Sequence, residues 1–273
     1  MWTKARNRLR ESARAFRATA TNRNLRRMQL SFGATWTAEW AFTVALGVVA
    51  FDQGGAAAVG LVAFVRTAPA ALLSPLGSAL GDRVRRDRVL FWSCLIRAGA
   101  TGAAALLLSG DSSIAAVYAL AVVATAAFTV FRPVHSALLP ALCRTPLELT
   151  SANVVRGLID SLSTLLGPLA AAALLSFGSP EAVIAFAAVL SAWSGLLLLR
   201  LSYETRSRTA PQPLTRILHE TAEGFRALWR YRDARSVVGI GLAQVFTRGC
   251  LTVFLVVVAL DLLELGEPGV GVL

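Results

Sequence analysis

The apolar residues of this chain are gathered into long blocks that short polar connections separate. Seven blocks stand out: 30–51, 56–80, 89–109, 113–138, 151–177, 181–201 and 236–260. Each holds about 20 residues or more, and 20 helical residues at 1.5 Å each match a hydrocarbon core of about 30 Å. Only helices satisfy their own backbone hydrogen bonds in lipid at this segment length. The pattern therefore predicts an all-α, polytopic transmembrane helical bundle.

The composition excludes several other classes of protein. Hydrophobic residues make up 55% of the 273 residues, which is too many for a soluble chain of this length. The cysteines Cys94, Cys143 and Cys250 form no CxxC pair, so neither a disulfide framework nor a metal site is predicted. Lys4 is the one lysine, so no P-loop can supply its lysine from within the apolar blocks. We expect no enzyme, no cofactor and no metal.

The position of the charges predicts how the chain is oriented in the membrane. The net charge is +11, and the amino-terminal arm and every second connection hold all but five of the 27 Lys and Arg residues. The alternate connections carry acids and no bases: Asp52, Asp111, Glu181, Asp261, Glu264 and Glu267. By the positive-inside rule the amino terminus is cytoplasmic, in a plasma or inner membrane. Topology and anionic lipid then explain the basicity, and no nucleic-acid partner is expected.

A repeat joins the first and seventh blocks. The segment "TVALGVVAFD" (43–52) and the segment "TVFLVVVALD" (252–261) lie 209 positions apart and are identical at seven of ten positions, including the polar Thr and Asp at their ends. Chance similarity between two apolar helices is the alternative explanation. If the repeat is real, its unit is six helices, and this chain is a truncated product of a parent with about twelve spans.

This interpretation divides the chain into four parts. Residues 1–29 form a cytoplasmic basic arm, and residues 30–201 form an amino-terminal six-helix bundle. Residues 202–235 form a cytoplasmic linker, in which the amphipathic pattern of 213–233 predicts an interfacial helix. Residues 236–273 are the seventh helix and the start of a truncated carboxy-terminal half.

The stretch "LVAFVRTAPAALLSPLGSALGDRVRRDRVL" (61–90) resembles the second helix and following loop of major facilitator superfamily transporters. The loop signature of that family is written G-x-L-a-D-r-x-G-r-r. Ser78 and Arg85 stand where the family has glycines. The matching positions are Leu80, Asp82, Arg83 and Arg86. The resemblance implies that Asp82, Arg83 and Arg86 form a loop that biases the conformational equilibrium, and the alternative is a loop that only anchors topology.

A second stretch, "FRPVHSALLPALCRTPLELTSANVVRGLIDSLSTLLGPL" (131–169), is similar to the fourth and fifth helices of the efflux branch, which includes macrolide and enterobactin exporters. Gly167 and Pro168 partly match the antiporter signature of the fifth helix. The resemblance implies a secondary active transporter that exports small amphipathic molecules, in exchange for protons, by alternating access. The alternative is a membrane scaffold or sensor, or an inactive fragment, that transports nothing.

Charged residues inside the spans are candidate site residues, because a charge near the bilayer centre costs at least about 2.5–3.5 kcal/mol. Glu39, Arg66 and Arg248 lie near the middles of spans one, two and seven, and the repeat makes Glu39 and Arg248 equivalent. The resemblance implies that both face a central cavity, with Glu39 as a proton-coupling carboxylate. Alternatively, Glu39 only neutralises Arg66 or Arg248, since a nearby arginine favours the charged carboxylate.

Three further arginines lie in the spans. Arg156 and Asp160 are one helical turn apart, which predicts a local ion pair and leaves Asp160 as a second protonation candidate. Arg97 and Arg132 lie nearer the predicted cytoplasmic side, where we expect them to reach the interface or the carboxylates of the loops.

Overall fold

The computed structural model of the chain describes residues 21–110, 113–199, 201, 223, 226, 229–263 and 265–272, with the backbone alone for 70–83. The predicted basic arm therefore lies largely outside the described residues. Of the predicted interfacial helix, only Glu223, Arg226 and residues 229–233 are described.

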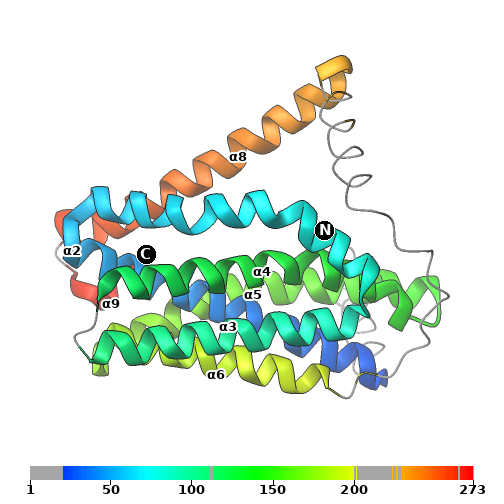
Figure 1. Cartoon of the computed structure of the whole chain (residues 1–273), viewed down its shortest axis with the longest axis horizontal. Coiled ribbons are helices and arrows are strands. Elements are labelled where there is room, and N and C mark those ends of the chain that lie inside the picture. Colours follow the sequence, from blue (N-terminus) through cyan, green and yellow to red (C-terminus); the bar gives the residue numbers. More distant parts are fainter. Residues whose placement is uncertain are drawn as a thin grey trace, which may run out of the picture.

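The described chain is a bundle of long helices, and no strand occurs among its described residues. The helices are α2 (Arg23–Arg83), α3 (Arg86–Ser109), α4 (Ile114–Leu142), α5 (Pro146–Phe177), α6 (Pro180–Leu198), α8 (Arg232–Val257), the π-helical turn η1 (Val258–Leu262) and the short α9 (Gly266–Val272). Six of the described helical segments are long and apolar enough to cross a membrane. This confirms the prediction of an all-α transmembrane bundle (Figure 1).

Helix α2 contains the first two predicted spans. Its 61 residues are interrupted at Gly54 (φ −172°, ψ 28°) and Gly55 (φ 60°, ψ −153°). The conformation of Gly55 is one that only glycine adopts without strain. The chain reverses its direction there, so the two arms of α2 are antiparallel (Figure 1, blue and cyan). We call them the first arm, before Gly54, and the second arm, after Gly55.

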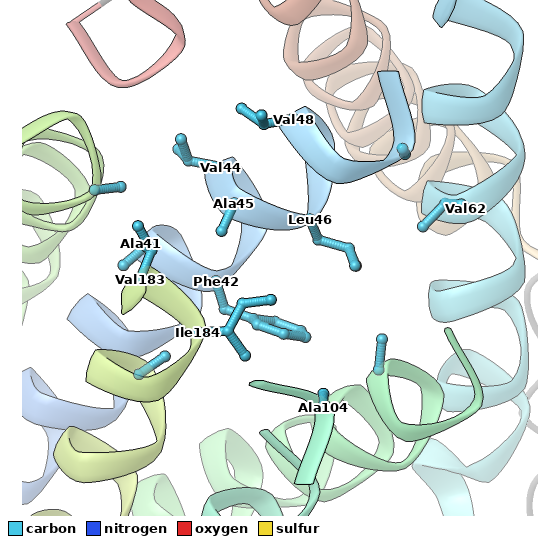
Figure 2. Close-up of a cluster of buried hydrophobic side chains, with 14 of the residues drawn as sticks. Ala41, Phe42, Val44, Ala45, Leu46, Val48, Val62, Ala104, Val183 and Ile184 are labelled. Atoms are coloured by element: carbon cyan, nitrogen blue, oxygen red, sulfur yellow. The ribbon is translucent and has the colours of Figure 1, made fainter. Parts of the chain in front are cut away.

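The first arm of α2 lies at the centre of the bundle, because α2 contacts α4, α5 and α6. Its Phe42 and Leu46 are buried in a cluster that includes Ala104 of α3 and Ile184 of α6 (Figure 2). Many members of this cluster are alanines or valines. Small side chains let helix backbones approach closely, and in lipid this packing replaces the hydrophobic effect as the source of helix association.

Helix α5 closely approaches the first arm at Gly167. A Cβ atom at this position would lie 2.4 Å from the Cβ of Trp40 and 2.9 Å from the carbonyl oxygen of Thr37. The short α9 packs onto the same stretch of α5, where a Cβ on Gly271 would lie 2.4 Å from the carbonyl oxygen of Pro168. The predicted Gly167-Pro168 motif therefore lies where the backbone of α5 packs closely against the first arm of α2 and against α9.

Helix α8 diverges from the bundle and meets it near its carboxyl end (Figure 1, orange). Val256 is its buried residue, and a Cβ on Gly47 of the first arm would lie 3.2 Å from Val256 Cγ2. Positions 47 and 256 are 209 apart, as the repeat requires of equivalent residues. Equivalent residues meet at a two-fold axis, so this contact agrees with the pseudo-symmetry, which stays a prediction.

Candidate functional site

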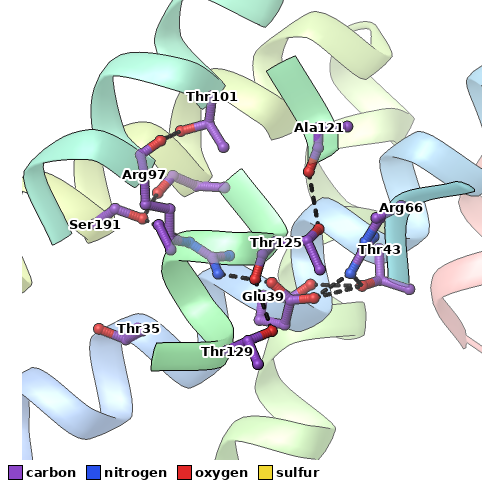
Figure 3. A network of polar contacts seen from close by, with 12 residues as sticks. Thr35, Glu39, Thr43, Arg66, Arg97, Thr101, Ala121, Thr125, Thr129 and Ser191 are labelled. Atoms are coloured by element: carbon purple, nitrogen blue, oxygen red, sulfur yellow. Dashed lines mark hydrogen bonds and ion pairs between the residues drawn. The ribbon is translucent and has the colours of Figure 1, made fainter. Parts of the chain in front are cut away.

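Glu39 lies between two arginines in the interior of the bundle (Figure 3). Arg97 Nη1 of α3 donates to Glu39 Oε2 at 2.7 Å, and Arg66 Nη2 of the second arm donates to Glu39 Oε1. The side chain of Arg97 is 1% exposed and that of Glu39 is 14% exposed. We call Glu39, Arg66 and Arg97 the ion triad. It carries one more positive than negative charge.

Hydroxyl groups extend the ion triad to a further helix. Arg97 Nε donates to Ser191 Oγ of α6 at 3.2 Å, and Arg66 Nη2 donates to Thr43 Oγ1 at 3.0 Å. Both guanidinium groups also lie against aromatic rings: Arg66 is 5.3 Å from the centroid of Phe42, and Arg97 is 4.9 Å from that of Phe128. The network thus joins both arms of α2 to α3 and α6.

The ion triad shows which of the mid-span arginines Glu39 meets. Its pair with Arg66, one of the two alternatives, is present, whereas Arg248 lies over the ring of Trp40, 5.9 Å from its centroid, and does not pair with Glu39. The prediction that Arg97 reaches the interface or the loops was wrong. Arg97 is the single charged residue of the block 89–109, and this isolation is the sequence signal that could have placed it in the interior.

The predicted pair of Arg156 with Asp160 is not formed. Both side chains are described, and no ion pair within 4.0 Å joins them. Arg156 Nη1 instead donates to Ser136 Oγ of α4 at 2.7 Å, and its guanidinium lies 5.1 Å from the ring centroid of Phe32. The reason is that α4 packs close enough to offer a hydroxyl acceptor. Asp160 is left partly exposed.

Arg132 is exposed and lies against an aromatic ring, and its expected reach to the membrane interface stays a prediction. Its guanidinium lies 5.0 Å from the ring centroid of Trp36. Trp36 belongs to the same face of α2 as Phe32 and Trp40, because the three are spaced four residues apart. Each of these three rings is therefore in contact with the guanidinium group of an arginine from a different helix. Nothing in the sequence pattern indicated this pairing, because the partners lie far apart along the chain.

The predicted gating loop is largely helical. Helix α2 continues to Arg83, and α3 begins at Arg86. The side chains of Asp82 and Arg83 lie outside the described residues. Arg86 Nη1 donates to the carbonyl oxygen of Ala137 at 2.8 Å. This bond ties the connection between α2 and α3 to the carboxyl-terminal part of α4.

No group of three or more His, Cys, Asp or Glu residues is placed to hold a metal ion in the described parts of the chain. The chemistry that the site offers is therefore that of guanidinium groups, one central carboxylate, hydroxyls and aromatic rings.

A comparison with protein families gives a match over most of the chain. The family described as the Major Facilitator Superfamily matches residues 29–270. A search among curated proteins gives no match. Together with the apolar helices, the family match shows a multi-pass membrane protein of a transporter family, not of an enzyme family. The chain belongs to the major facilitator superfamily.

Proposed function

We propose that this protein is a secondary active transporter that exports small amphipathic molecules, in exchange for protons, by alternating access. It works in a plasma or inner membrane with its amino terminus in the cytoplasm. The observation that carries the proposal is the ion triad, which places one carboxylate between arginines of two other helical segments.

The ion triad is suited to couple proton uptake to movement of helices. A proton added to Glu39 removes its charge and leaves Arg66 and Arg97 without their ionic partner. A buried charge that loses its partner is strongly unfavourable, so the protonated state favours a different arrangement of the helices. A conformational equilibrium responds to such a difference between its two states.

Other residues have supporting roles in this proposal. Asp160 is a second protonation position, because Arg156 bonds to Ser136 and forms no close ion pair with Asp160. The bond of Arg86 to Ala137 holds the cytoplasmic ends of α3 and α4 together in this state. Asp82 and Arg83 belong to the same gating connection by resemblance to the family signature.

The test uses inverted membrane vesicles that contain the full chain and a dye that reports the internal pH. Addition of an amphipathic substrate dye should release protons from vesicles with the wild-type protein. We expect Glu39→Gln to lower this proton release by tenfold or more, and Asp160→Asn to lower it less. Asp233→Asn is the control, since Asp233 is exposed at the start of α8. Unchanged proton release in both Glu39→Gln and Asp160→Asn would remove both residues from the coupling mechanism.

A further inference from the structure

We propose that the arginines over the aromatic face of α2 form a binding site for a small organic anion that carries a carboxylate or phosphate group. The inference rests on the proposed transport function and names its substrate class. Three arginines form the site, and we call them the arginine column: Arg132, Arg156 and Arg248.

The geometry of the column follows from the spacing of the rings beneath it. Successive rings at four-residue intervals rise about 6 Å along a helix. The guanidinium carbons lie 5.1 Å from the centroid of Phe32 (Arg156), 5.0 Å from that of Trp36 (Arg132) and 5.9 Å from that of Trp40 (Arg248). Helices α4, α5 and α8 thus each bring one positive charge to the same face of the first arm.

The column keeps most of its hydrogen-bond donors free. A guanidinium group that stacks on an aromatic ring contacts it with its flat face. Its N–H groups point outward from the edge and stay available for hydrogen bonds. Arg132 and Arg248 are exposed, and their guanidinium groups donate to no acceptor within the described part of the chain. Arg156 has one bond, to Ser136. These donors are positioned for an acceptor that the protein does not itself supply.

The protein balances the charges of the column only in part, since three arginines face one nearby carboxylate. Arg132 and Arg156 repel each other electrostatically, and Asp160 is the carboxylate that acts on Arg156. Glu39 is already held by Arg66 and Arg97, so it is not free to neutralise the column. Unbalanced arginines within membrane spans are costly. An anion that enters from solution would supply the missing negative charge.

The surroundings define which anion fits best. Planar carboxylates and phosphates accept two parallel N–H bonds from one guanidinium, which makes them the strongest partners of arginine. Phe128 lies 5.0 Å from Trp36, and both Phe128 and Trp40 are partly exposed. These rings offer apolar surface to the organic part of a ligand. The site therefore favours an amphipathic anion and disfavours an amphipathic cation of the same size.

The test measures binding of benzoate to the purified full chain in nanodiscs of neutral phosphatidylcholine, so that anionic lipid does not compete. Trp36 and Trp40 lie beneath two of the arginines, so intrinsic tryptophan fluorescence reports occupancy. We expect saturable binding of benzoate, no binding of benzylamine at the same concentrations, and weaker binding of inorganic phosphate. Benzylamine binding as tight as benzoate binding, or phosphate binding tighter than benzoate binding, would overturn the proposal.

Variants assign the binding to the column. Arg132→Gln and Arg156→Gln should each weaken benzoate binding by tenfold or more. Arg132→Lys keeps the charge but loses the planar fork, so it should bind benzoate with intermediate affinity if the fold is intact. Arg235→Gln, at an exposed position of α8, should bind like the wild type. Equal affinity in Arg132→Gln, Arg156→Gln and wild type would contradict the assignment.

The two proposals fail differently. Proton-coupled movement of a cationic dye without benzoate binding would overturn the anion site and leave the transporter. Benzoate binding without proton-coupled movement of anionic or cationic dyes would support the site and overturn the proposed transport.

Discussion

At the level of single residues, the interior charges of this protein differ in how completely they are neutralised. Arg97 is fully buried and shares Glu39 with Arg66, whereas Arg132 and Arg248 are exposed and lie against rings. Removing a buried hydrogen-bonded charge destabilises the fold more than removing an exposed one, because it leaves polar groups unpaired in a site without water. We therefore expect the fold to depend on Arg97 and not on the exposed arginines.

Replacement of Arg97 by glutamine should lower the free energy of unfolding by about 1–3 kcal/mol, because it removes the hydrogen bonds of Arg97 to Glu39 and Ser191 while Arg66 still neutralises Glu39. Thermal unfolding of the purified protein in detergent measures the change. Arg88→Gln is the matched control, since Arg88 is an exposed arginine of the same helix. An equal melting temperature for the two variants would mean that the pair of Arg97 with Glu39 does not stabilise the bundle.

At the level of helices, glycines set how closely the elements approach. Gly167 of α5 lies against the backbone of the first arm, whereas a Cβ added to Gly157 of the same helix would have no atom within 4 Å. Gly55 has a different role, since its positive φ reverses the chain between the two arms. The same residue type therefore serves packing at one place and backbone conformation at another.

The Gly167→Ala variant should be destabilised by about 1–3 kcal/mol, because the added methyl group forces α5 away from α2. Gly157→Ala should be neutral or slightly stabilising, since alanine favours a helix by about 1 kcal/mol over glycine. The melting temperatures of the two variants, measured side by side, test this. If Gly167→Ala melts no lower than Gly157→Ala, the close approach does not exist in the membrane.

At the level of the whole molecule, acids from distant segments meet where α9 docks. Burial raises the pKa of Glu267, and the charges of Asp52 and Glu181 raise it further. Asp52 precedes the reversal of α2, and Glu181 lies in the first turn of α6. The docked state thus disfavours ionised Glu267, in contrast to an undocked α9 in which the carboxyl is surrounded by water.

The direction of the pH effect on docking follows from this raised pKa. Below the ordinary value of 4.5, Glu267 is protonated in both states and docking is strongest. As the pH rises from that value through the raised pKa, the undocked state loses its proton first, so docking weakens. Hydrogen exchange of the α9 amides should therefore quicken over this range.

Glu267→Gln should exchange slowly at all of these pH values, because it cannot ionise. Asp261→Asn, in the exposed turn before α9, is the control and should behave as the wild type does. Exchange in the wild type that does not change with pH, once corrected for the intrinsic rate, would show that Glu267 plays no part in docking.

The bundle could be predicted from the sequence because its cause is local. Runs of about 20 apolar residues form helices in lipid wherever they occur, since nothing else satisfies their backbone groups. The apolar blocks, the acidic connection at Asp52 and the family signature around Leu80 are all properties of short stretches. The candidate site could be predicted in part: because mid-span charges are few, the sequence predicts that Glu39 neutralises either Arg66 or Arg248 as one of its two interpretations.

The remaining contacts depend on tertiary packing. Glu39 meets Arg97, which lies 58 residues away, and Arg156 bonds to Ser136 on α4 and not to Asp160 on its own helix. Helical periodicity tells which residues share a face within one helix, but not which face the next helix presents to it. The class of fold, the spans and the charges inside them thus follow from the amino-acid order alone. Which of those charges are neutralised, and which remain free to bind, follows only from how the helices pack against one another.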